Sequence, residues 1–159
     1  MKKMLFFENA KLLTEEFDII PLMYGSLGLE YITDEALNSD DIDILIPQIF
    51  LKIRWNEFAD FLLKEGYALV DEHEHTFQKN GILYSYAPIE ELENFAEIRL
   101  SEINQYSEYD VHFKLLSLEQ YLKVYQASAK DGYRINIRKK KDNEKIVFIK
   151  NYLKNNILK

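Results

Sequence analysis

Two short segments of this sequence carry residue types that could bind a metal-bound triphosphate. The first is Gly25-Ser26, and the second, after the spacer 27–40, is Asp41-Ile42-Asp43. Aspartates at positions i and i+2 of a strand point to the same face, and two like charges held together are costly unless a cation lies between them. Oxygen-only ligands favour Mg²⁺ or Mn²⁺. Because a glycine lets the backbone approach phosphate oxygens closely and a serine adds a hydroxyl donor, the pattern predicts a nucleotide site with Asp41 and Asp43 as metal ligands.

An Asp-x-Asp pattern also occurs on solvated strand faces, where it has no functional role. Here the residues from Asp41 to Ile46 alternate strictly, with isoleucines on the face opposite the two aspartates. This alternation predicts a strand with one buried face, closed by Pro47. The preceding Gly-Ser and the apolar neighbours favour a site over a solvated face.

Helices and further strands are predicted on both sides of these residues. Before the site we expect an amphipathic helix at 4–16 and a largely buried strand at 17–24, in which Pro21 indicates a bulge or an edge. Residues 27–40 are predicted as a loop or short helical turn. After the site we expect a helix from Trp55 to Gly66, followed by strands at 67–78 and 82–87 around the turn Lys79-Asn80-Gly81. A short helix at 90–96 and a strand at 109–115 come next. Two helices are expected at the end, one opened by the capping box Ser117–Gln120 and the other starting at about Asp142.

This order of elements predicts an α/β (α+β) fold in which helices pack on a small mixed β-sheet, with a C-terminal helical segment. A chain of 159 residues is long enough for one such core. We expect a single domain overall, with the core at residues 1–100. The final strand and the C-terminal helices, residues 101–159, are expected to pack on the same core.

The composition bounds the function. A net charge of −7 makes nucleic acid an unfavourable partner, because phosphate contacts need a positive face. The sequence has no Cys, which excludes disulfides and thiolate metal sites. No stretch approaches the roughly 20 apolar residues that span a bilayer. We therefore expect a cytoplasmic protein with no membrane partner, and a homodimer remains open.

The motif resembles that of a known superfamily. Hydrophobic-Gly-Ser at 24–26, followed by Asp-hydrophobic-Asp-hydrophobic at 41–44, is similar to the hallmark of the nucleotidyltransferases, whose fold resembles the palm of polymerase β. The resemblance covers about residues 17–96 and looks closest to a small bacterial branch that includes aminoglycoside nucleotidyltransferases and minimal nucleotidyltransferase antitoxins. A weaker similarity lies in Lys141-Asp142-x-x-Lys145-Ile146, which resembles a Lys-Asp-x-x-Asp-Ile segment of that branch.

The resemblance implies transfer of a nucleoside monophosphate from a nucleoside triphosphate to a hydroxyl of a small molecule or protein. Asp41 and Asp43 would bind two metal ions, Mg²⁺ or Mn²⁺, which clamp the triphosphate while pyrophosphate leaves in line from the α-phosphorus. Gly25 and Ser26 would hold the β- and γ-phosphates. The acceptor cannot be inferred from these residues.

Active members of the family carry a third carboxylate on the strand after the hairpin turn. On this alignment it falls at Ser85, and a serine cannot replace a carboxylate as a base or as a strong metal ligand. Either Glu74 or Glu91 substitutes, or activity has been lost. The alternative function is therefore a catalytically degenerate member that binds a nucleotide or a partner protein. A third hypothesis is an unrelated α/β domain whose aspartates are only solvated.

Two weaker groups remain. His73 and His75 would share a strand face and could bind a transition metal with His112, although a solvated strand is the favoured interpretation. The basic run Arg138-Lys139-Lys140-Lys141 could contact phosphates or an acidic partner, and an exposed start of a helix is favoured.

Overall fold

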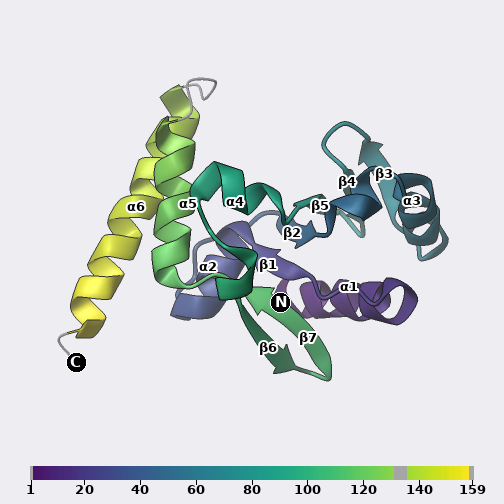
Figure 1. Cartoon of the computed structure of the whole chain (residues 1–159), viewed down its shortest axis with the longest axis horizontal. Helices are drawn as coiled ribbons and strands as arrows, with labels where there is room; N and C mark the ends of the chain where they lie inside the picture. Colours follow the sequence, from purple (N-terminus) through teal and green to yellow (C-terminus); the bar gives the residue numbers. More distant parts are fainter. Residues whose placement is uncertain (1, 131–135, 158–159) are drawn as a thin grey trace. The chain divides into compact units, whose positions relative to one another are not determined.

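The computed structural model describes residues 2–130 and 136–157. The chain forms two compact units, one from residues 1–90 and 104–115 and the other from residues 91–103 and 116–159. Figure 1 shows the elements of both units in sequence colours. Among the described helices, none has the length and apolar composition needed to cross a membrane.

The first unit contains the sheet and three α-helices. Its elements in chain order are α1 (Lys2–Phe17), β1 (Leu22–Tyr24), α2 (Gly25–Thr33), β2 (Ile42–Ile46), the 3-10 helix η1 (Gln48–Leu51), α3 (Trp55–Lys64), β3 (Ala68–Asp71), β4 (Thr76–Lys79), β5 (Ile82–Pro88), β6 (Asn104–Glu108) and β7 (Val111–Leu115).

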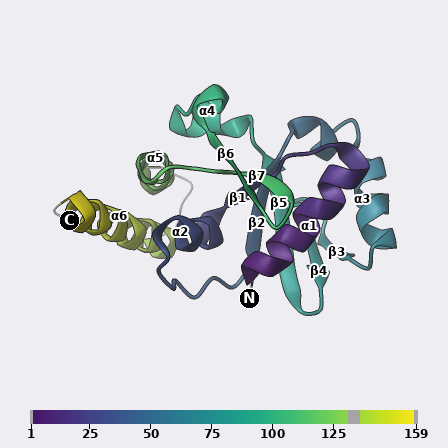
Figure 2. The same ribbon diagram turned by 90° about the horizontal axis from the view of Figure 1, so that it is seen from below.

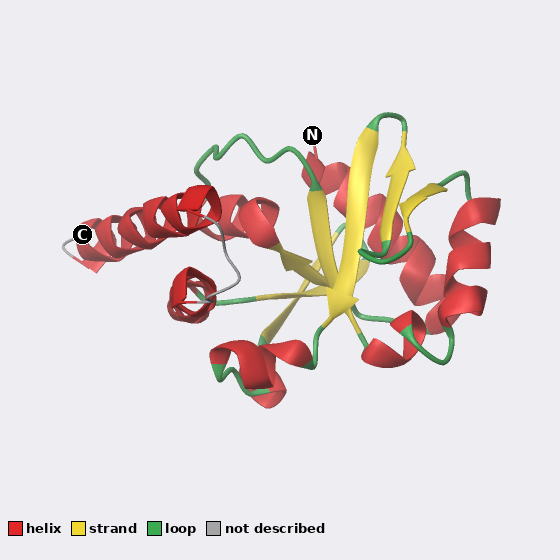
Figure 3. Ribbon diagram, turned by 90° about the horizontal axis from the view of Figure 1, so that it is seen from above, coloured by secondary structure: helices red, strands yellow, loops and turns green. Residues whose placement is uncertain are grey.

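The sheet has seven strands in the order β3-β4-β5-β2-β1-β7-β6. Figure 3 draws the strands in yellow. Its centre is mixed, because β2 runs antiparallel to β1 and parallel to β5, and β1 runs parallel to β7. Antiparallel hairpins extend it on both sides. The structure thus has the small mixed sheet with packed helices that the sequence predicts.

One face of the sheet is the core of this unit. Ile42, Ile44 and Ile46 are all fully buried there, as the alternation of β2 predicts. The prediction of a single buried face holds only in part, because Leu45, on the same face as Asp43, is buried as well. Helices α1 and α3 contribute residues such as Phe6 and Phe58 to the same cluster, and Figure 2 shows α1 running across the strands. Asp43 is therefore on the opposite face from this core.

Two sequence predictions for the segment before β2 are wrong in extent. The strand expected at 17–24 is only β1, because α1 continues to Phe17 and Pro21, which has no N–H, lies just outside the strand. The loop or short helical turn expected at 27–40 is the end of the helix α2 followed by a loop. The helix starts earlier than expected, directly at Gly25, because no polar residue marks its start; Tyr24 in the N-cap position makes no capping hydrogen bond.

The hairpin arm expected as one strand at 67–78 is two strands. A turn at 72–75 separates β3 from β4, and His75 takes a left-handed backbone conformation with φ of 53°. The carboxylate of Asp71 accepts a hydrogen bond from the Glu74 amide at 3.1 Å, which closes this turn. The turn between β4 and β5 is as predicted, since Asn80 and Gly81 both have positive φ, as a type I′ hairpin requires.

The second unit is mostly helical. It consists of α4 (Glu91–Ala96), the 3-10 helix η2 (Leu100–Glu102), α5 (Leu118–Lys130) and α6 (Asn136–Ile157). The capping box is confirmed: the Ser117 amide donates to Gln120 Oε1 at 2.9 Å, and the Gln120 amide donates to Ser117 Oγ at 3.2 Å. Helices α5 and α6 lie side by side, and between them the buried Ser128 hydroxyl donates to Asp142 Oδ2 at 2.6 Å.

Candidate functional site

Two of the predicted site residues from different segments of the chain, Gly25 and Asp43, lie against each other. Gly25 directly follows β1 and has φ of 62°, and its neighbour Tyr24 is the register partner of Asp43 on β2. A Cβ atom placed on Gly25 would lie 2.5 Å from Asp43 Oδ2 and 3.3 Å from Asp43 Cβ. Any other residue here would displace the carboxylate and would also strain the backbone. The glycine is thus required by its conformation and by the space that Asp43 occupies.

The other two predicted site residues flank this pair along the chain. Ser26 is the second residue of α2 and is half-buried. Asp41 is exposed and directly precedes β2, where Asp43 is half-buried. That Ser26 and Asp41 join Gly25 and Asp43 in one site remains a prediction.

Ser85, the position expected for the third carboxylate, lies on the strand beside Asp43. Strands β2 and β5 are parallel, and Asp43 and Ser85 are partners in their register. Ser85 is also the partner of Thr76 on β4, and the two hydroxyl oxygens are 2.9 Å apart in a hydrogen bond. Sequence reasoning missed Thr76. The signal was present in the hairpin turn, because a two-residue turn at Asn80-Gly81 sets the register that pairs residue 76 with residue 85.

The two glutamates considered as substitutes for Ser85 have different surroundings. Glu74 is exposed in the turn between β3 and β4, not on a strand facing Ser85 as expected. Glu91 is the exposed first residue of α4 in the second unit.

The histidine hypothesis is contradicted. His73 and His75 lie in the turn at 72–75, so they share no strand face. The ring of His75 packs edge-on against Trp55, with 4.9 Å between the two ring centroids. His112 is on β7, separated from this turn by the width of the sheet. Over residues 2–130 and 136–157, no group of three or more His, Cys, Asp or Glu side chains is arranged to hold a metal ion.

The basic run at 138–141 lies within α6. Lys140 and Lys141 are exposed, and the side chains of residues 138 and 139 are outside what the structure describes.

The face of the sheet opposite Asp43 holds a group of buried tyrosines. Tyr84 is 2% exposed, and burial raises its pKa to about 12. Burial likewise raises the pKa of Tyr67 and Tyr86. The Asn9 amide donates to the Tyr67 hydroxyl at 3.0 Å. These phenols are part of the core, and their side chains point away from the face that bears Asp43 and Ser85.

The fold is similar to that of an aminoglycoside nucleotidyltransferase. The crystal structure of ANT(2'')-Ia in complex with adenylyl-2''-tobramycin matches with a TM-score of 0.60 and 12% sequence identity, covering 96% of this chain and 90% of that one. The solution structure of the antibiotic-resistance factor ANT(2'')-Ia matches with a TM-score of 0.55 and 13% identity, covering 99% and 94%. The nucleotidyltransferase fold expected from the Gly-Ser and Asp-x-Asp motifs is thereby confirmed.

At the level of sequence, no family model matches the chain. It is 38% identical over 150 residues to the uncharacterized protein YnaI of Bacillus subtilis (strain 168), which covers 94% of this chain and 96% of that protein. The chain belongs to the same protein family as YnaI.

Proposed function

We propose that this protein is a metal-dependent nucleotidyltransferase that transfers a nucleoside monophosphate from a nucleoside triphosphate to a hydroxyl group. The observation that carries the proposal is the packing of the Asp43 carboxylate on the Gly25 backbone, where β1 ends and α2 begins. In this proposal Gly25 and Ser26 bind the β- and γ-phosphates, and Asp41 and Asp43 bind Mg²⁺ or Mn²⁺.

The start of α2 is suited to a phosphate group. The first backbone N–H groups of a helix point along its axis and carry partial positive charge, which favours anions. The first turn of α2 contains no acidic residue, and Tyr24 supplies no side-chain cap. The Ser26 hydroxyl in the same turn is a further hydrogen-bond donor, and because it is neutral it does not repel a triphosphate.

The donor set also suits a hard divalent cation. Asp41 and Asp43 offer only carboxylate oxygens, and Mg²⁺ in nucleotide enzymes is commonly held by one or two carboxylates together with substrate phosphates and water. When bound, the cation would neutralise the triphosphate and polarise its α-phosphorus.

The residues of the chain itself would hold and orient the triphosphate. Asp43 lies against Gly25, where the absence of a side chain leaves room for the carboxylate at the end of β1. Transfer breaks the bond from the α-phosphorus to the bridging oxygen and forms one to the acceptor oxygen, which must lose its proton. Ser85 cannot take that proton, because a hydroxyl is not a base near neutral pH.

A second candidate function follows from that position. Ser85 is the register partner of Asp43 and is hydrogen-bonded to Thr76, so a pair of neutral hydroxyls lies beside Asp43. On the alignment suggested by the sequence resemblance, active nucleotidyltransferases carry a carboxylate at this position. With one negative charge fewer, the site would hold metal and nucleotide weakly and transfer slowly or not at all. The alternative is therefore a catalytically degenerate protein that binds a nucleotide or a partner protein.

Thermal unfolding tests the binding step. The full chain is melted with Mg²⁺ or Mn²⁺ alone, with each of the four common nucleoside triphosphates alone, and with both together, at millimolar concentrations. A ligand of the folded state at 100 times its dissociation constant stabilises the fold by about 2.7 kcal/mol, so metal and nucleotide together should raise Tm more than either alone. Asp43→Asn should abolish this rise, and Asp60→Asn on the exposed face of α3 is the matched control.

Pyrophosphate release separates the two candidates. Release that needs Mg²⁺ or Mn²⁺ and is lost in Asp43→Asn supports transfer, with water or an added alcohol as acceptor. Stabilisation by metal and nucleotide without release supports the degenerate binder. Unchanged Tm with all four triphosphates and both metals would overturn both.

A further inference from the structure

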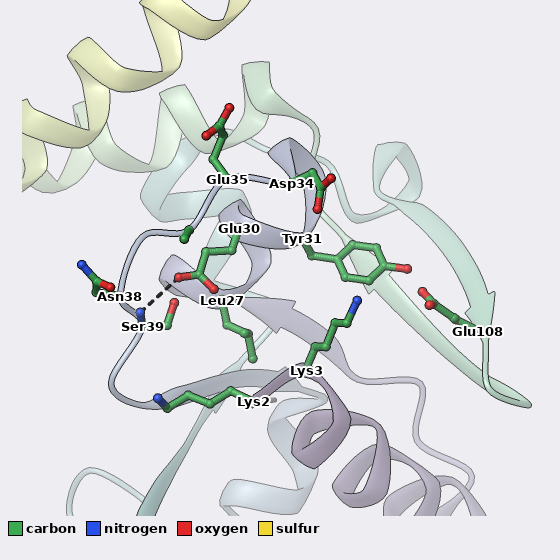
Figure 4. Close-up of a pocket in the computed structure, with 11 residues that line it drawn as sticks. Lys2, Lys3, Leu27, Glu30, Tyr31, Asp34, Glu35, Asn38, Ser39 and Glu108 are labelled. Carbon is green, nitrogen blue, oxygen red and sulfur yellow. Dashed lines mark hydrogen bonds between the residues drawn. The ribbon is translucent and has the colours of Figure 1, made fainter.

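A polar pocket lies in the first unit, at the far end of α2 from Gly25. Its volume is about 720 Å³, and residues of α1, α2, the loop after α2 and β6 line it (Figure 4). None of the residues proposed above for the nucleotide site lines it. The pocket is therefore a different place on the first unit from the proposed nucleotide site.

Charged residues of both signs line this pocket. The lysines are at the start of one helix and the carboxylates of Glu30 and Asp34 are at the end of another, which in both cases is unfavourable for the interaction with the helix dipole. Lys2 and Lys3 are in the first turn of α1, which has no acidic residue, although the start of a helix is its positive end. Glu30 lies in the last turn of α2 and Asp34 is its C-cap residue, although the end of a helix is its negative end. Each of these charges opposes the dipole of its own helix, so none of them is explained by stabilisation of that helix.

The opposite charges do not neutralise one another. In the described part of the chain, Lys2, Lys3, Asp34 and Glu108 take part in no ion pair, although all of them line the same pocket. The ammonium of Lys3 instead lies 6.0 Å from the centre of the Tyr31 ring. The pocket thus presents separate positive and negative groups to whatever enters it.

Hydrogen bonds hold the loop that forms one wall of the pocket, but one buried hydroxyl in this wall has no hydrogen-bond partner among the described residues. Glu30 Oε1 accepts the amides of Leu37 at 2.7 Å and Ser39 at 3.1 Å, which fixes the loop on α2. The side chain of Ser39 is only 8% exposed, and its Oγ has no hydrogen-bond partner among the described residues. Figure 4 draws this hydroxyl on the inner side of the loop, turned towards Glu30. A buried hydroxyl without a protein partner commonly bonds a water or a ligand, so the Ser39 hydroxyl is available to a polar group in the pocket.

We propose that this pocket binds a small zwitterion, a molecule with one ammonium and one carboxylate group, such as a free amino acid. The ammonium lies at the Glu30 and Asp34 end of α2, and the carboxylate lies at Lys3, whose ammonium points towards Tyr31 in Figure 4, while Lys2 points to the other side of the pocket. A polyamine would meet the two lysines, and a phosphate compound would meet the carboxylates. Only a ligand with both charges relieves both helix ends.

The test is isothermal titration of the full chain, without metal or nucleotide, with each of the twenty common amino acids. At least one is expected to give saturable binding. Its N-acetyl derivative, which lacks the ammonium, and its amide, which lacks the carboxylate, should each bind at least tenfold more weakly. Because these derivatives are tested on the unaltered protein, this comparison does not depend on any variant folding correctly.

Two variants with matched controls test the location. Asp34→Asn keeps a residue that tolerates the φ of 58° at this C-cap, and it should weaken binding at least fivefold. Asp18→Asn is its control, because Asp18 follows α1 with φ of 56°, its amide bonds the carbonyl of Thr14 in the same way, and it does not line the pocket. Lys3→Gln should also weaken binding, while Lys11→Gln, on an exposed part of the same helix, should not.

Binding that needs both ligand charges and is weakened by Asp34→Asn and Lys3→Gln, with unchanged affinity in both controls, establishes the site. No binding by any of the twenty amino acids, equal binding of a blocked derivative, or equal affinity in the pocket variants and their controls would overturn the proposal.

Discussion

Asp43 on β2 and Ser85 on β5 are register partners in adjacent parallel strands. Partners in register point to the same face of a sheet, so a side chain at position 85 stands beside the Asp43 carboxylate. Thr76, the partner of Ser85 on its other side, completes a row of one carboxylate and two hydroxyls across three strands. Asp43 is the carboxylate of this row, and a substitution at position 85 can place a second one beside it.

Ser85→Glu should bind Mn²⁺ about tenfold more tightly than the parent, because the added carboxylate is a hard ligand next to Asp43. The metal-free variant should lose about 1 kcal/mol of unfolding free energy, since the bond to Thr76 is lost and like charges are brought together. Titration calorimetry with Mn²⁺ and urea unfolding measure the two effects.

Ser107→Glu on the exposed edge strand β6 is the control for the added charge. Asp41→Ala should bind Mn²⁺ more weakly than the parent. Equal affinity in the parent and Ser85→Glu would mean that residue 85 does not contribute to the metal site.

Gly25→Ala should destabilise the protein more than Gly81→Ala does. Both glycines have positive φ, which costs an alanine about 1–2 kcal/mol. Only at Gly25 would the new Cβ overlap another group, since it would lie 2.5 Å from Asp43 Oδ2, whereas at Gly81 no atom lies within 4 Å. The overlap should add at least about 1 kcal/mol, measured by urea unfolding. Equal losses in the two variants would show that the Asp43 carboxylate moves aside freely.

The unfolding free energy should fall between pH 10 and about pH 12. The folded-state pKa of Tyr84 is raised by burial to about 12, above the value of about 10 for an unfolded chain. The folded state then favours the neutral phenol, so this contribution is complete below pH 10 and is lost as the pH rises through the folded-state pKa.

Tyr84→Phe should reduce this alkaline loss by roughly 1–2 kcal/mol, leaving the part that the buried Tyr67 and Tyr86 contribute. Tyr109→Phe, at a residue that is 55% exposed, is the control. Urea unfolding at pH 8, 10, 11 and 12 measures the effect. An identical pH profile for the parent and Tyr84→Phe would contradict the assignment.

Ser128→Ala should lower the unfolding free energy by about 1.5–3 kcal/mol, because it removes the hydroxyl donor of a buried carboxylate. Ser101→Ala, at an exposed position in η2 of the same unit, should change it by less than about 0.5 kcal/mol. Chemical unfolding followed by circular dichroism gives both values. A loss at Ser128 no larger than that at Ser101 would show that Asp142 finds another partner.

Several elements could be predicted because their determinants are local. Strict alternation predicts the buried face of β2, and Asn80-Gly81 predicts the hairpin between β4 and β5. The hairpin between β6 and β7 was missed, and only its second strand was expected. Its turn residues, Tyr109 and Asp110, have φ of 53° and 59° without any glycine, so the usual signal is absent.

The sequence alone determined which functional groups are present: a glycine and a serine before two aspartates, with no carboxylate at position 85. Only the tertiary structure decided which of these groups meet. The pairing of β1 with β2 brings Gly25 against Asp43, the pairing of β2 with β5 sets Ser85 beside it, and the strand order keeps His112 away from His73. Strand order and register depend on contacts between residues far apart in the chain, whereas periodicity and turn signals report only on neighbouring residues.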